Sequence, residues 1–278
     1  MNTNKLQIKE FKLKWMADHA AIAMIAKRGT GKSYIIRDIA YHYRRMPGGV
    51  VISPTDKLTA YYKFFFPDLY IHYDIKESTI KNILTRQSQI ICKSKDKRKQ
   101  GKKLDPRGIL IMDDCLADKK SWAKDVSIRE ILMNGRHYQL TYILAMQTPL
   151  GIPPDLRLNF DYVFLLKDDS NINKKKLYDN YASIFPSLAD FIRVFSICTR
   201  DFTSMVVDIK KTVDKIEDKI FWFKAKRRKF VFGSRQFRNL HKKYYDPTFK
   251  TKEWQSPADN ILLARKNKIG LDIKIEKI

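Results

Sequence analysis

The stretch from residue 20 to residue 34 constrains the fold of this chain more than any other part of the sequence. The apolar run Ala20 to Ala26 has the composition of a buried strand, and a helical pattern begins at Tyr34. The loop between them carries Gly29 and Gly31, so the order is strand, glycine loop and helix, which is typical of a P-loop. Glycines let successive backbone N–H groups turn toward an anion, and the helix directs the positive end of its dipole at phosphates. The stretch therefore predicts a binding site for nucleotide phosphates.

Two side chains of this loop have expected roles in such a site. Lys32 can reach the β- and γ-phosphates of ATP, and the Ser33 hydroxyl can ligate Mg²⁺. One residue departs from the pattern G-x-x-x-x-G-K-[ST], because Ala26 stands where the first glycine is expected. Glycine loops also arise by chance, so the rest of the chain has to support this interpretation. The residues that we expect to bind the nucleotide are Lys27, Arg28, Gly29, Thr30, Gly31, Lys32, Ser33 and Tyr34.

Two carboxylates end a second predicted strand. The apolar run Ile109 to Met112 leads directly into Asp113 and Asp114. A central parallel strand is apolar on both faces, and ligands bind where such strands end. Burying two carboxylates there costs free energy unless a Mg²⁺-bound nucleotide compensates their charge. We therefore expect Asp113 to hold the Mg²⁺ shell through water, and Asp114 to be the general base that orients the attacking water.

A glutamine follows a third predicted strand. The run Leu140 to Ala145 is mostly apolar, and Gln147 comes soon after it. A polar side chain at the tip of a strand beside the phosphate loop can contact the γ-phosphate or the attacking water. We expect Gln147 to have this catalytic role together with Lys32 and Asp114. A glutamine that only caps its strand is the alternative.

Strands and helices alternate along the chain as far as residue 210, which predicts a doubly wound α/β fold. Strands are expected over 20–26, 50–54, 108–114, 140–145, 161–166 and 202–209. Helices are expected over 34–45, 77–92, 119–133, 171–181 and 186–198. Residues 93–107 hold eight cations and two acids, which predicts an exposed loop that is either solvated or in contact with DNA.

The chain is strongly basic, with 55 Lys and Arg against 30 Asp and Glu and a formal charge of +25. Such a balance favours a polyanionic partner, first of all nucleic acid, although a lysine-rich composition from an AT-rich genome explains part of it. The character of the sequence changes near residue 210, so we expect an ATPase domain over 1–210 and a basic, partly extended region over 211–278.

Nine cations and no acid lie between Lys224 and Lys243, interleaved with Phe230, Phe232 and Phe237. This pattern is typical of a nucleic-acid contact, with cations for phosphates and aromatic rings for bases or for a partner pocket. The alternative is a segment that docks on the acidic surface of this protein or of another one.

Compartment and membrane class follow from what the sequence lacks. The three cysteines, Cys92, Cys115 and Cys198, show neither metal spacing nor a disulfide framework. The apolar runs have the length of strands, and residues 1–15 lack the apolar core of a signal peptide. We expect an intracellular, soluble protein with no membrane partner.

The motifs occur in an order that resembles a known family. They are Ala26-x-x-Gly-x-Gly-Lys-Ser33, Ile109-Leu-Ile-Met-Asp-Asp114, Asn134-Gly-Arg-His137 and Leu144-Ala-Met-Gln147. Over roughly residues 18 to 210 the chain is similar to the viral genome-packaging ATPases of the FtsK–HerA superfamily. It looks most like the A32-type branch of large eukaryotic DNA viruses, virophages and related elements. Asp114 stands where the wider superfamily usually has glutamate, which shortens the reach of the general base.

The resemblance implies a RecA-like P-loop core of the additional-strand class. In that class a central, mostly parallel sheet is flanked by helices, and the strand over 140–147 lies between the P-loop strand and the strand of Asp113. The family also implies a ring of roughly five or six identical subunits that uses ATP and Mg²⁺ to thread double-stranded DNA into a preformed capsid. Capsid vertex proteins are further partners, and the site of action is the viral assembly site in the host cytoplasm and the virion. An arginine from the next subunit completes the site, with Arg136 as the first candidate and Arg157 as the second.

Three other functions remain open at this point. A HerA-like helicase or DNA pump shares the core motifs, and a P-loop nucleotide kinase shares the phosphate loop. A non-catalytic protein that binds DNA or capsid and keeps a vestigial nucleotide site is the third. Hydrolysis that double-stranded DNA stimulates would separate the packaging ATPase and the helicase from the other two.

Overall fold

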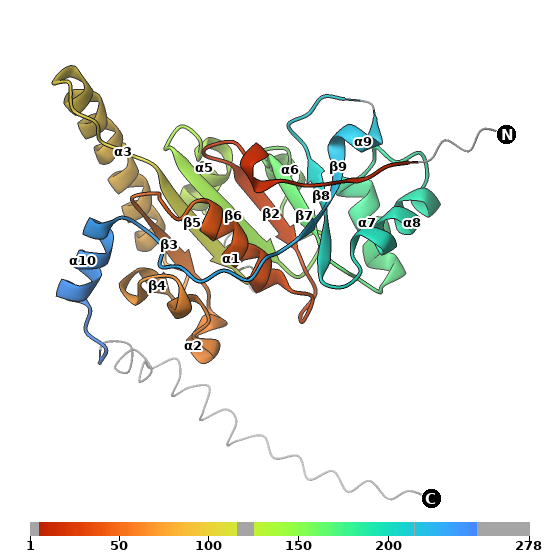
Figure 1. Cartoon of the computed structure of the whole chain (residues 1–278), viewed down its shortest axis with the longest axis horizontal. Helices are drawn as coiled ribbons and strands as arrows, with labels where there is room; N and C mark the ends of the chain where they lie inside the picture. Colours follow the sequence, from red (N-terminus) through yellow and green to blue (C-terminus); the bar gives the residue numbers. More distant parts are fainter. Residues whose placement is uncertain (1–5, 116–124, 214, 249–278) are drawn as a thin grey trace, which may run out of the picture.

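A nine-stranded sheet forms the centre of the computed structural model, which describes residues 6–115, 125–213 and 215–248 (Figure 1). The strand order is β1-β9-β8-β7-β2-β6-β5-β3-β4. Neighbouring strands are parallel except β7 with β8 and β8 with β9, which are antiparallel. The prediction of a mostly parallel α/β sheet is confirmed. The strands are β1 (Lys9–Glu10), β2 (Ala21–Ile25), β3 (Gly48–Ile52), β4 (Ile71–His72), β5 (Gly108–Asp113), β6 (Leu140–Met146), β7 (Tyr162–Leu165), β8 (Thr203–Asp208) and β9 (Ile220–Lys224).

The central strands are buried along their whole length, which explains why their sequences are continuous apolar runs. Strand β6 lies between β2 and β5, with Leu144 opposite Ala23 on one side and Met112 on the other. This is the order of the additional-strand class, so the implied position of the 140–147 strand is confirmed. It brings the carboxyl ends of the three motif-bearing strands to one edge of the sheet.

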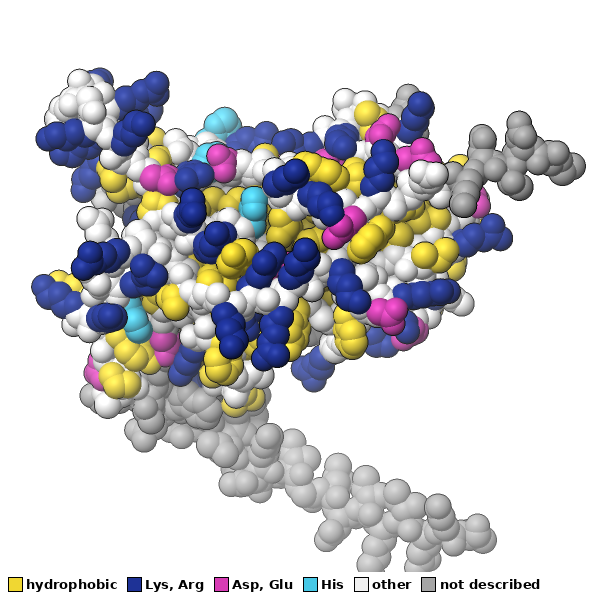
Figure 2. Space-filling view, in the orientation of Figure 1, with side chains coloured by type: hydrophobic (Ala, Val, Ile, Leu, Met, Phe, Trp, Pro, Cys, Tyr) yellow, Lys and Arg dark blue, Asp and Glu magenta, His cyan; other side chains and the backbone are white. Residues whose placement is uncertain are grey.

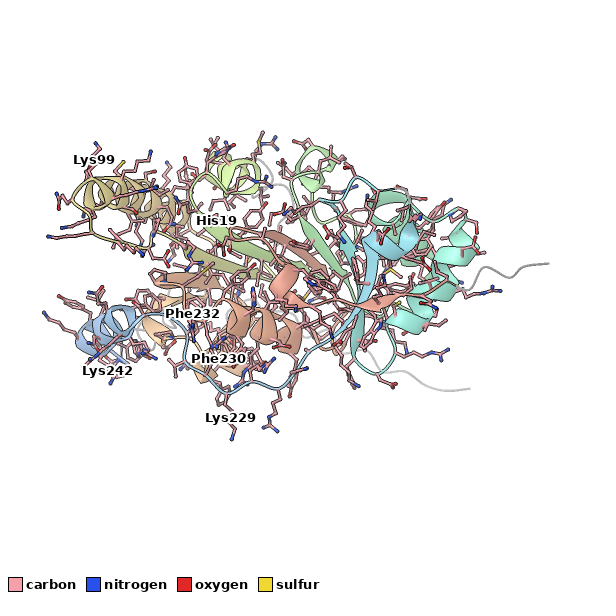
Figure 3. The ribbon with its side chains drawn as sticks, turned by 45° about the horizontal axis from the view of Figure 1, so that its top comes forward. His19, Lys99, Lys229, Phe230, Phe232 and Lys242 are labelled. Carbon is pink, nitrogen blue, oxygen red and sulfur yellow. The ribbon has the colours of Figure 1, made fainter. Side chains whose placement is uncertain are left out.

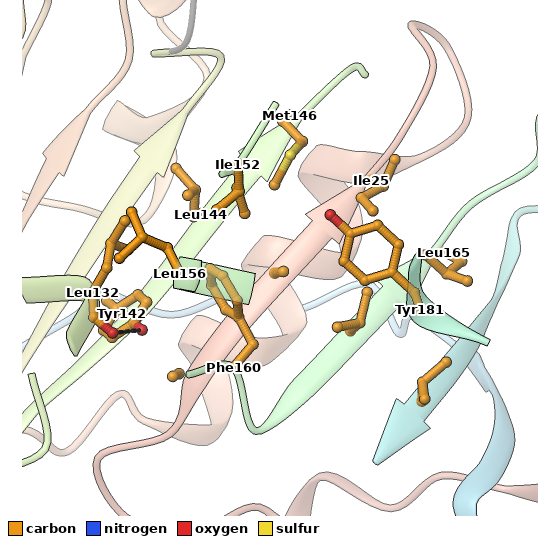
Figure 4. Packing of buried hydrophobic residues seen from close by; sticks show 14 of the residues in the cluster. Ile25, Leu132, Tyr142, Leu144, Met146, Ile152, Leu156, Phe160, Leu165 and Tyr181 are labelled. Carbon is orange, nitrogen blue, oxygen red and sulfur yellow. Dashed lines mark hydrogen bonds between the residues drawn. The ribbon is translucent and has the colours of Figure 1, made fainter. Parts of the chain in front are cut away.

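Helices and loops cover the two faces of the sheet with different partners. One face packs against apolar side chains of α3 (Glu77–Lys99), α5 (Val126–Asn134), α6 (Pro154–Arg157), α7 (Asn171–Tyr181) and α8 (Leu188–Cys198). Figure 4 shows this packing around Leu144, Leu156, Phe160 and Tyr181. The other face packs against α1 (Lys32–His42) and against the aromatic stretch, residues 61–66, which contains η2 (Tyr62–Phe64). The short helices η1 (Leu13–Trp15), α2 (Asp56–Thr59), η3 (Asp68–Tyr70) and α9 (Ile216–Lys219) complete the described elements, together with α10 (Arg235–Tyr244).

Helix α3 is longer than the sequence indicated. It continues to Lys99 and projects beyond the sheet, so the predicted loop over 93–107 is wrong for its first half (Figure 1). Lysine, arginine and glutamine have good helix propensity, and cations in the last turn interact favourably with the helix dipole. The chain turns back after Gly101, which has φ +70°, and Ser94 donates a hydrogen bond to the carbonyl of Leu104 at 2.7 Å. The predicted helix over 119–133 is observed from Val126, where Asp125 caps it; residues 119–124 lie outside the described part.

The basic region after residue 210 is joined to the sheet. Strand β9 inserts between β8 and β1, and residues 225–233, here called the strap, then run across α1 to α10 (Figure 1). The buried carboxylate of Asp38 on α1 accepts hydrogen bonds from the Lys226 N–H at 2.8 Å and the Arg228 Nε–H at 2.7 Å. The change at residue 210 is therefore one of composition rather than of packing. Residues 249–278 lie outside the described part.

Of the three phenylalanines that the sequence analysis singled out in this region, two belong to the core. Phe232 is fully buried and stacks on Phe66 with ring centroids 4.8 Å apart, while Phe237 is 8% exposed and stacks on Tyr70. Phe230 is half-buried against Tyr41 and Phe65. The prediction that these rings face bases or a partner pocket is wrong, because they anchor the strap and α10 on the same chain.

This anchoring predicts a large effect on the free energy of unfolding when Phe232 is truncated. Replacing Phe232 with Ala should lower the free energy of unfolding by about 3–5 kcal/mol, because it leaves a cavity beside Phe66. The neighbouring change Val231→Ala, at a side chain that is 53% exposed, should cost less than about 0.5 kcal/mol. Denaturant unfolding followed by circular dichroism measures both. Equal stability of the two variants would show that the strap does not pack on the sheet in solution.

Candidate functional site

The glycine loop joins β2 to α1 at the carboxyl edge of the sheet. Gly29 and Gly31 have φ of +81° and +96°, which L side chains rarely adopt, so these two positions require glycine. Ala26 is different, because it extends β2, donates its N–H to the Met146 carbonyl at 2.9 Å and is 1% exposed. Ala26 is not one of the described residues that have a positive φ. The loop therefore keeps its shape without a glycine at the first position of the motif.

Lys32 is held between two carboxylates at the start of α1. Its Nζ lies 2.9 Å from Asp113 Oδ1 and 2.5 Å from Asp114 Oδ1. The three side chains are only 11%, 5% and 15% exposed. Because the two acids lie close together in a poorly solvated place, the Lys32 ammonium group is the counter-charge for both. The structure thus brings together three residues that the sequence had placed in one site.

Backbone geometry directs both carboxylates to the same lysine. Asp113 is the last residue of β5, and Asp114 follows in the left-handed region with φ +53° while its N–H donates to the Ala145 carbonyl at 3.2 Å. Aspartate and asparagine tolerate this conformation better than most side chains. Strand alternation would point consecutive side chains to opposite faces of the sheet. The turn at Asp114 breaks that alternation, so both acids reach Lys32.

A tyrosine from the aromatic stretch completes the environment of Asp113. The Tyr62 hydroxyl donates a hydrogen bond to Asp113 Oδ2 at 2.9 Å, and both side chains are buried. Burial raises the pKa of Asp113, and the charge of Lys32 opposes that rise. Burial and the neighbouring Asp113 raise the pKa of Tyr62, so the phenol stays a neutral donor. Nothing in the local sequence pattern around Tyr62 points to the carboxylate of Asp113.

The oxygen atoms of this site suit a nucleotide that brings its own Mg²⁺. Mg²⁺ prefers oxygen ligands and is usually held by one or two carboxylates with water and phosphate oxygens. Asp113 and the hydroxyl of Ser33, the second residue of α1, are of that kind. In the described part of the chain, no cluster of three or more His, Cys, Asp or Glu could hold a metal by itself. A metal here would depend on oxygens that the nucleotide and water supply.

Gln147 and the two arginine candidates lie in different places. Gln147 is exposed directly after β6, at the same edge as the glycine loop. Arg136 precedes β6 at the opposite edge, where its Nη2 lies 3.0 Å from Asp161 Oδ1 beside a pocket of about 500 Å³ that is also lined by His19 and Lys210. Its side chain is 60% exposed. Arg136 therefore cannot contact a nucleotide bound to Lys32 of its own subunit.

Arg157 is engaged within its own chain. Its Nε donates to the Ile152 carbonyl at 2.8 Å, its Nη1 donates to Asn180, and its guanidinium lies 5.9 Å from the Tyr181 ring centroid. These contacts give Arg157 a structural role in tying α6 to α7.

Exposed cations gather on the strap, on α10 and on the projecting end of α3. Lys226, Arg227 and Lys229 of the strap are exposed. Figure 3 shows Lys229 of the strap and Lys242 of α10 pointing outward, while Phe232 of the strap points inward. The projecting end of α3 carries Lys97, Arg98 and Lys99. Figure 2 shows far more Lys and Arg than Asp and Glu over the visible face. No helix within the described ranges is long and apolar enough to cross a bilayer.

A family model and several viral proteins match this chain. The model of the family described as poxvirus A32 protein matches residues 8–234. An uncharacterized protein of Acanthamoeba polyphaga mimivirus is 56% identical over 281 aligned positions, which cover 100% of this chain and 99% of the relative. An uncharacterized protein of Invertebrate iridescent virus 6 is 31% identical over 82% of this chain and 87% of its own length. The resemblance found in the motifs is thereby confirmed.

Solved structures show the same fold at low sequence identity. The genome packaging NTPase of Sulfolobus turreted icosahedral virus 2, in complex with AMPPCP, has a TM-score of 0.53 at 13% identity and covers 76% of this chain and 100% of its own. The DNA-packaging ATPase of Sulfolobus turreted icosahedral virus has a TM-score of 0.51 at 16% identity with the same coverage.

Proposed function

Because the chain belongs to the poxvirus A32 protein family, we propose that it is a viral genome-packaging ATPase that moves double-stranded DNA into a capsid. The observation that carries this proposal is the contact of Lys32 with Asp113 and Asp114 at the carboxyl edge of the sheet, where β2 and β5 end on either side of β6. The glycine loop supplies the backbone N–H groups that phosphates need. The two solved structures with the same fold are described as a packaging NTPase and a packaging ATPase, which supports the same activity here.

Nucleotide binding exchanges one set of charges for another in this proposal. On nucleotide binding, the Lys32 ammonium would leave Asp113 and Asp114 for the β- and γ-phosphates. Ser33 and Asp113 would hold a Mg²⁺, which would supply positive charge to the phosphates. The metal ion would replace the ammonium as the counter-charge of Asp113, and Asp114 would be left to bind water. Tyr62 keeps Asp113 in position throughout through its hydrogen bond to Oδ2.

Asp114 and Gln147 act on water in this proposal. Once Lys32 has moved, Asp114 Oδ1 is free to accept a hydrogen bond from a water molecule aligned with the γ-phosphate. Gln147 is exposed at the end of β6, between β2, which leads to the glycine loop, and β5, which carries Asp113, and it supplies a second contact to that water or to the γ-phosphate. General base catalysis of this type contributes about 10²–10⁴ in rate.

The position of Arg136 favours a site completed by a neighbouring subunit. Arg136 lies at the edge of the sheet opposite to Lys32, so it can serve only a nucleotide bound to another copy. Head-to-tail contacts between different faces of identical subunits close into a ring. We therefore assign Arg136 as the trans-acting arginine of a homo-oligomeric ring that works at the viral assembly site, with Arg157 as the second candidate. Capsid vertex proteins are the expected docking partners of such a ring.

The nucleotide site belongs to residues 1–210 in this proposal, and DNA is held by the strap and by the projecting end of α3. Both present exposed cations to a backbone that carries one phosphate charge per strand about every 3.4 Å. Deletion of the region after residue 210 would not test this, because it also removes β9 and four core phenylalanines. Charge substitutions that leave the core intact are the appropriate test.

Neutralising Lys226, Arg227 and Lys229 together to Gln should weaken binding to double-stranded DNA. The slope of log affinity against log salt should fall by about three, because each lost phosphate contact removes about 0.9. Fluorescence anisotropy with a labelled duplex between low and moderate salt measures the slope. The matched control replaces three exposed cations outside the strap and α3, Lys9, Lys175 and Arg193, and should change the slope much less. Equal changes in both triples would mean that only net charge matters.

ATP hydrolysis with and without double-stranded DNA tests the function as a whole. We expect turnover that depends on intact Lys32 and rises when the duplex is added. Turnover that ignores DNA but requires a small phosphate acceptor would instead show a nucleotide kinase. Binding of DNA without any hydrolysis would show a vestigial site.

A further inference from the structure

An aromatic side chain lies on the glycine loop without belonging to the core. Phe202 is 70% exposed, and it is outside both hydrophobic clusters of the described residues. A Cβ built on Gly31 would lie 3.5 Å from Phe202 Cδ1 and 3.6 Å from its Cβ, which is ordinary van der Waals contact. The ring therefore stands directly beside the loop that would hold phosphates.

The backbone that carries this ring is in an unfavourable conformation. Asp201 and Phe202 are consecutive residues in the left-handed region, with φ of +50° and +59°. For a bulky residue such a φ is a genuine outlier, and strained residues of this kind concentrate at ligand sites. Two hydrogen bonds from Thr203 close the turn. Its N–H donates to the Arg200 carbonyl at 2.9 Å, and its hydroxyl donates to the Cys198 carbonyl at 2.7 Å. A large apolar ring is thus held in solvent by a rigid turn.

The strand order places Phe202 on the side of the glycine loop opposite to the two acids. Strands β6 and β5, which lead to Asp114, lie on one side of β2, and strands β7 and β8 lie on the other. Strand β8 is antiparallel to β7, so its first residue, Thr203, lies at the same edge as the loop. A nucleotide whose terminal phosphate faces Lys32 and Asp114 must extend its base away from them. That direction leads toward Phe202.

We propose that Phe202 is a stacking platform for the base of the bound nucleotide, an inference that rests on the proposed ATPase function. The face of an exposed aromatic ring attracts a purine by stacking, which is tolerant of base identity because every base has a π-face. Phe202 positions the nucleotide from its base end, while Lys32 and Ser33 hold its phosphate end. The ring makes no bond to a reacting atom, so it is a positioning residue.

The test compares ATP with tripolyphosphate, which has the phosphates but no base. Phe202→Asn removes the ring while keeping a residue that tolerates positive φ, and we expect it to weaken ATP binding about tenfold and to leave tripolyphosphate binding unchanged. Phe202→Trp keeps a stacking face and should retain ATP affinity. Phe64→Ala is the matched control, because Phe64 is also a phenylalanine with 70% exposure, and it should bind both compounds as the unmodified chain does. Isothermal titration calorimetry measures all of these affinities.

Two results would overturn the inference. ATP affinity unchanged in Phe202→Asn would show that the base does not use the ring. Equal losses of ATP and tripolyphosphate binding would show that Phe202 only supports the shape of the glycine loop. Failure of the unmodified chain to bind either compound would instead overturn the proposed ATPase function, and the stacking role with it. Normal ATP binding by both the unmodified chain and Phe202→Asn would overturn the stacking role alone.

Discussion

Asp114→Asn is expected to leave ATP binding intact and to lower kcat for hydrolysis by about 10²–10⁴-fold. The amide cannot take a proton from water, but it can occupy the same space. Asparagine also tolerates the φ of +53° at this position, so the turn after β5 should be preserved. Removing one of the two negative charges beside Lys32 also makes it easier for the ammonium to leave for the phosphates. Calorimetric ATP titration and steady-state phosphate release separate binding from turnover.

Two further variants show whether the effect of Asp114→Asn is chemical. Asp179→Asn changes an exposed carboxylate on α7 and should leave both binding and turnover unchanged. Asp114→Glu keeps a carboxylate with a longer reach and should retain more activity than the amide. If Asp114→Asn hydrolyses ATP at the rate of the unmodified chain, Asp114 is not the general base. If Asp114→Asn loses ATP binding, its role is to build the site rather than to activate water.

Arg136→Ala is expected to bind ATP normally and to lose hydrolysis by about 10³–10⁵-fold, which is the range reported for trans-acting arginines in general. The loss arises because the neighbour's nucleotide lacks a cation that stabilises charge in the transition state. Mixing this variant with Asp114→Asn should partly restore hydrolysis. In a mixed ring, a subunit with Arg136→Ala keeps its own Asp114 and receives Arg136 from an adjacent Asp114→Asn subunit. Phosphate release measured across mixing ratios should pass through a maximum.

The ion pair between Arg136 and Asp161 offers a structural alternative that the same variants can test. Asp161 Oδ2 also accepts the N–H of Ala21 at 2.8 Å, so Asp161 fixes the start of β2. If Arg136 serves only to hold Asp161, then Arg136→Ala should lower the unfolding midpoint and mixing should restore nothing. Arg157→Ala is the comparison variant: its loss should affect stability, because Arg157 bonds Ile152 and Asn180. If mixing Arg157→Ala with Asp114→Asn restores hydrolysis instead, Arg157 is the trans-acting arginine and Arg136 is the structural one.

The sequence was informative where a motif or a run is local. Residues 20–26 and 109–112 are apolar at every position, so they indicated strands buried on both faces. The first run leads through the glycine loop to Lys32 and the second leads to Asp113 and Asp114, and the structure joins these three side chains. The alternation of strands and helices indicated the sheet. The order of β2, β6 and β5 followed from the family resemblance, because spacing alone does not determine which strands are neighbours.

The sequence was uninformative where contacts join distant segments. The sequence 224–243 has the charge of a solvated or nucleic-acid-binding segment, yet Phe232 and Phe237 are core residues because they meet Phe66 and Tyr70 from far along the chain. The hydrogen bond from Tyr62 to Asp113 and the contact of Phe202 with the glycine loop are of the same kind. The end of α3 was missed for a different reason, since its lysines suit an exposed helix and an exposed loop equally well.

The pairing of β1 with β9 has a consequence for how the protein is made. Lys9 lies opposite Phe221 and Glu10 opposite Trp222, so a strand from the start of the chain needs a partner from near its end. A nascent chain on the ribosome can form β2 and its neighbours early, but the sheet is incomplete until β9 and the strap have emerged. Contacts between such distant segments slow folding and leave strand edges exposed in the meantime. A truncated product of translation would therefore lack a finished sheet.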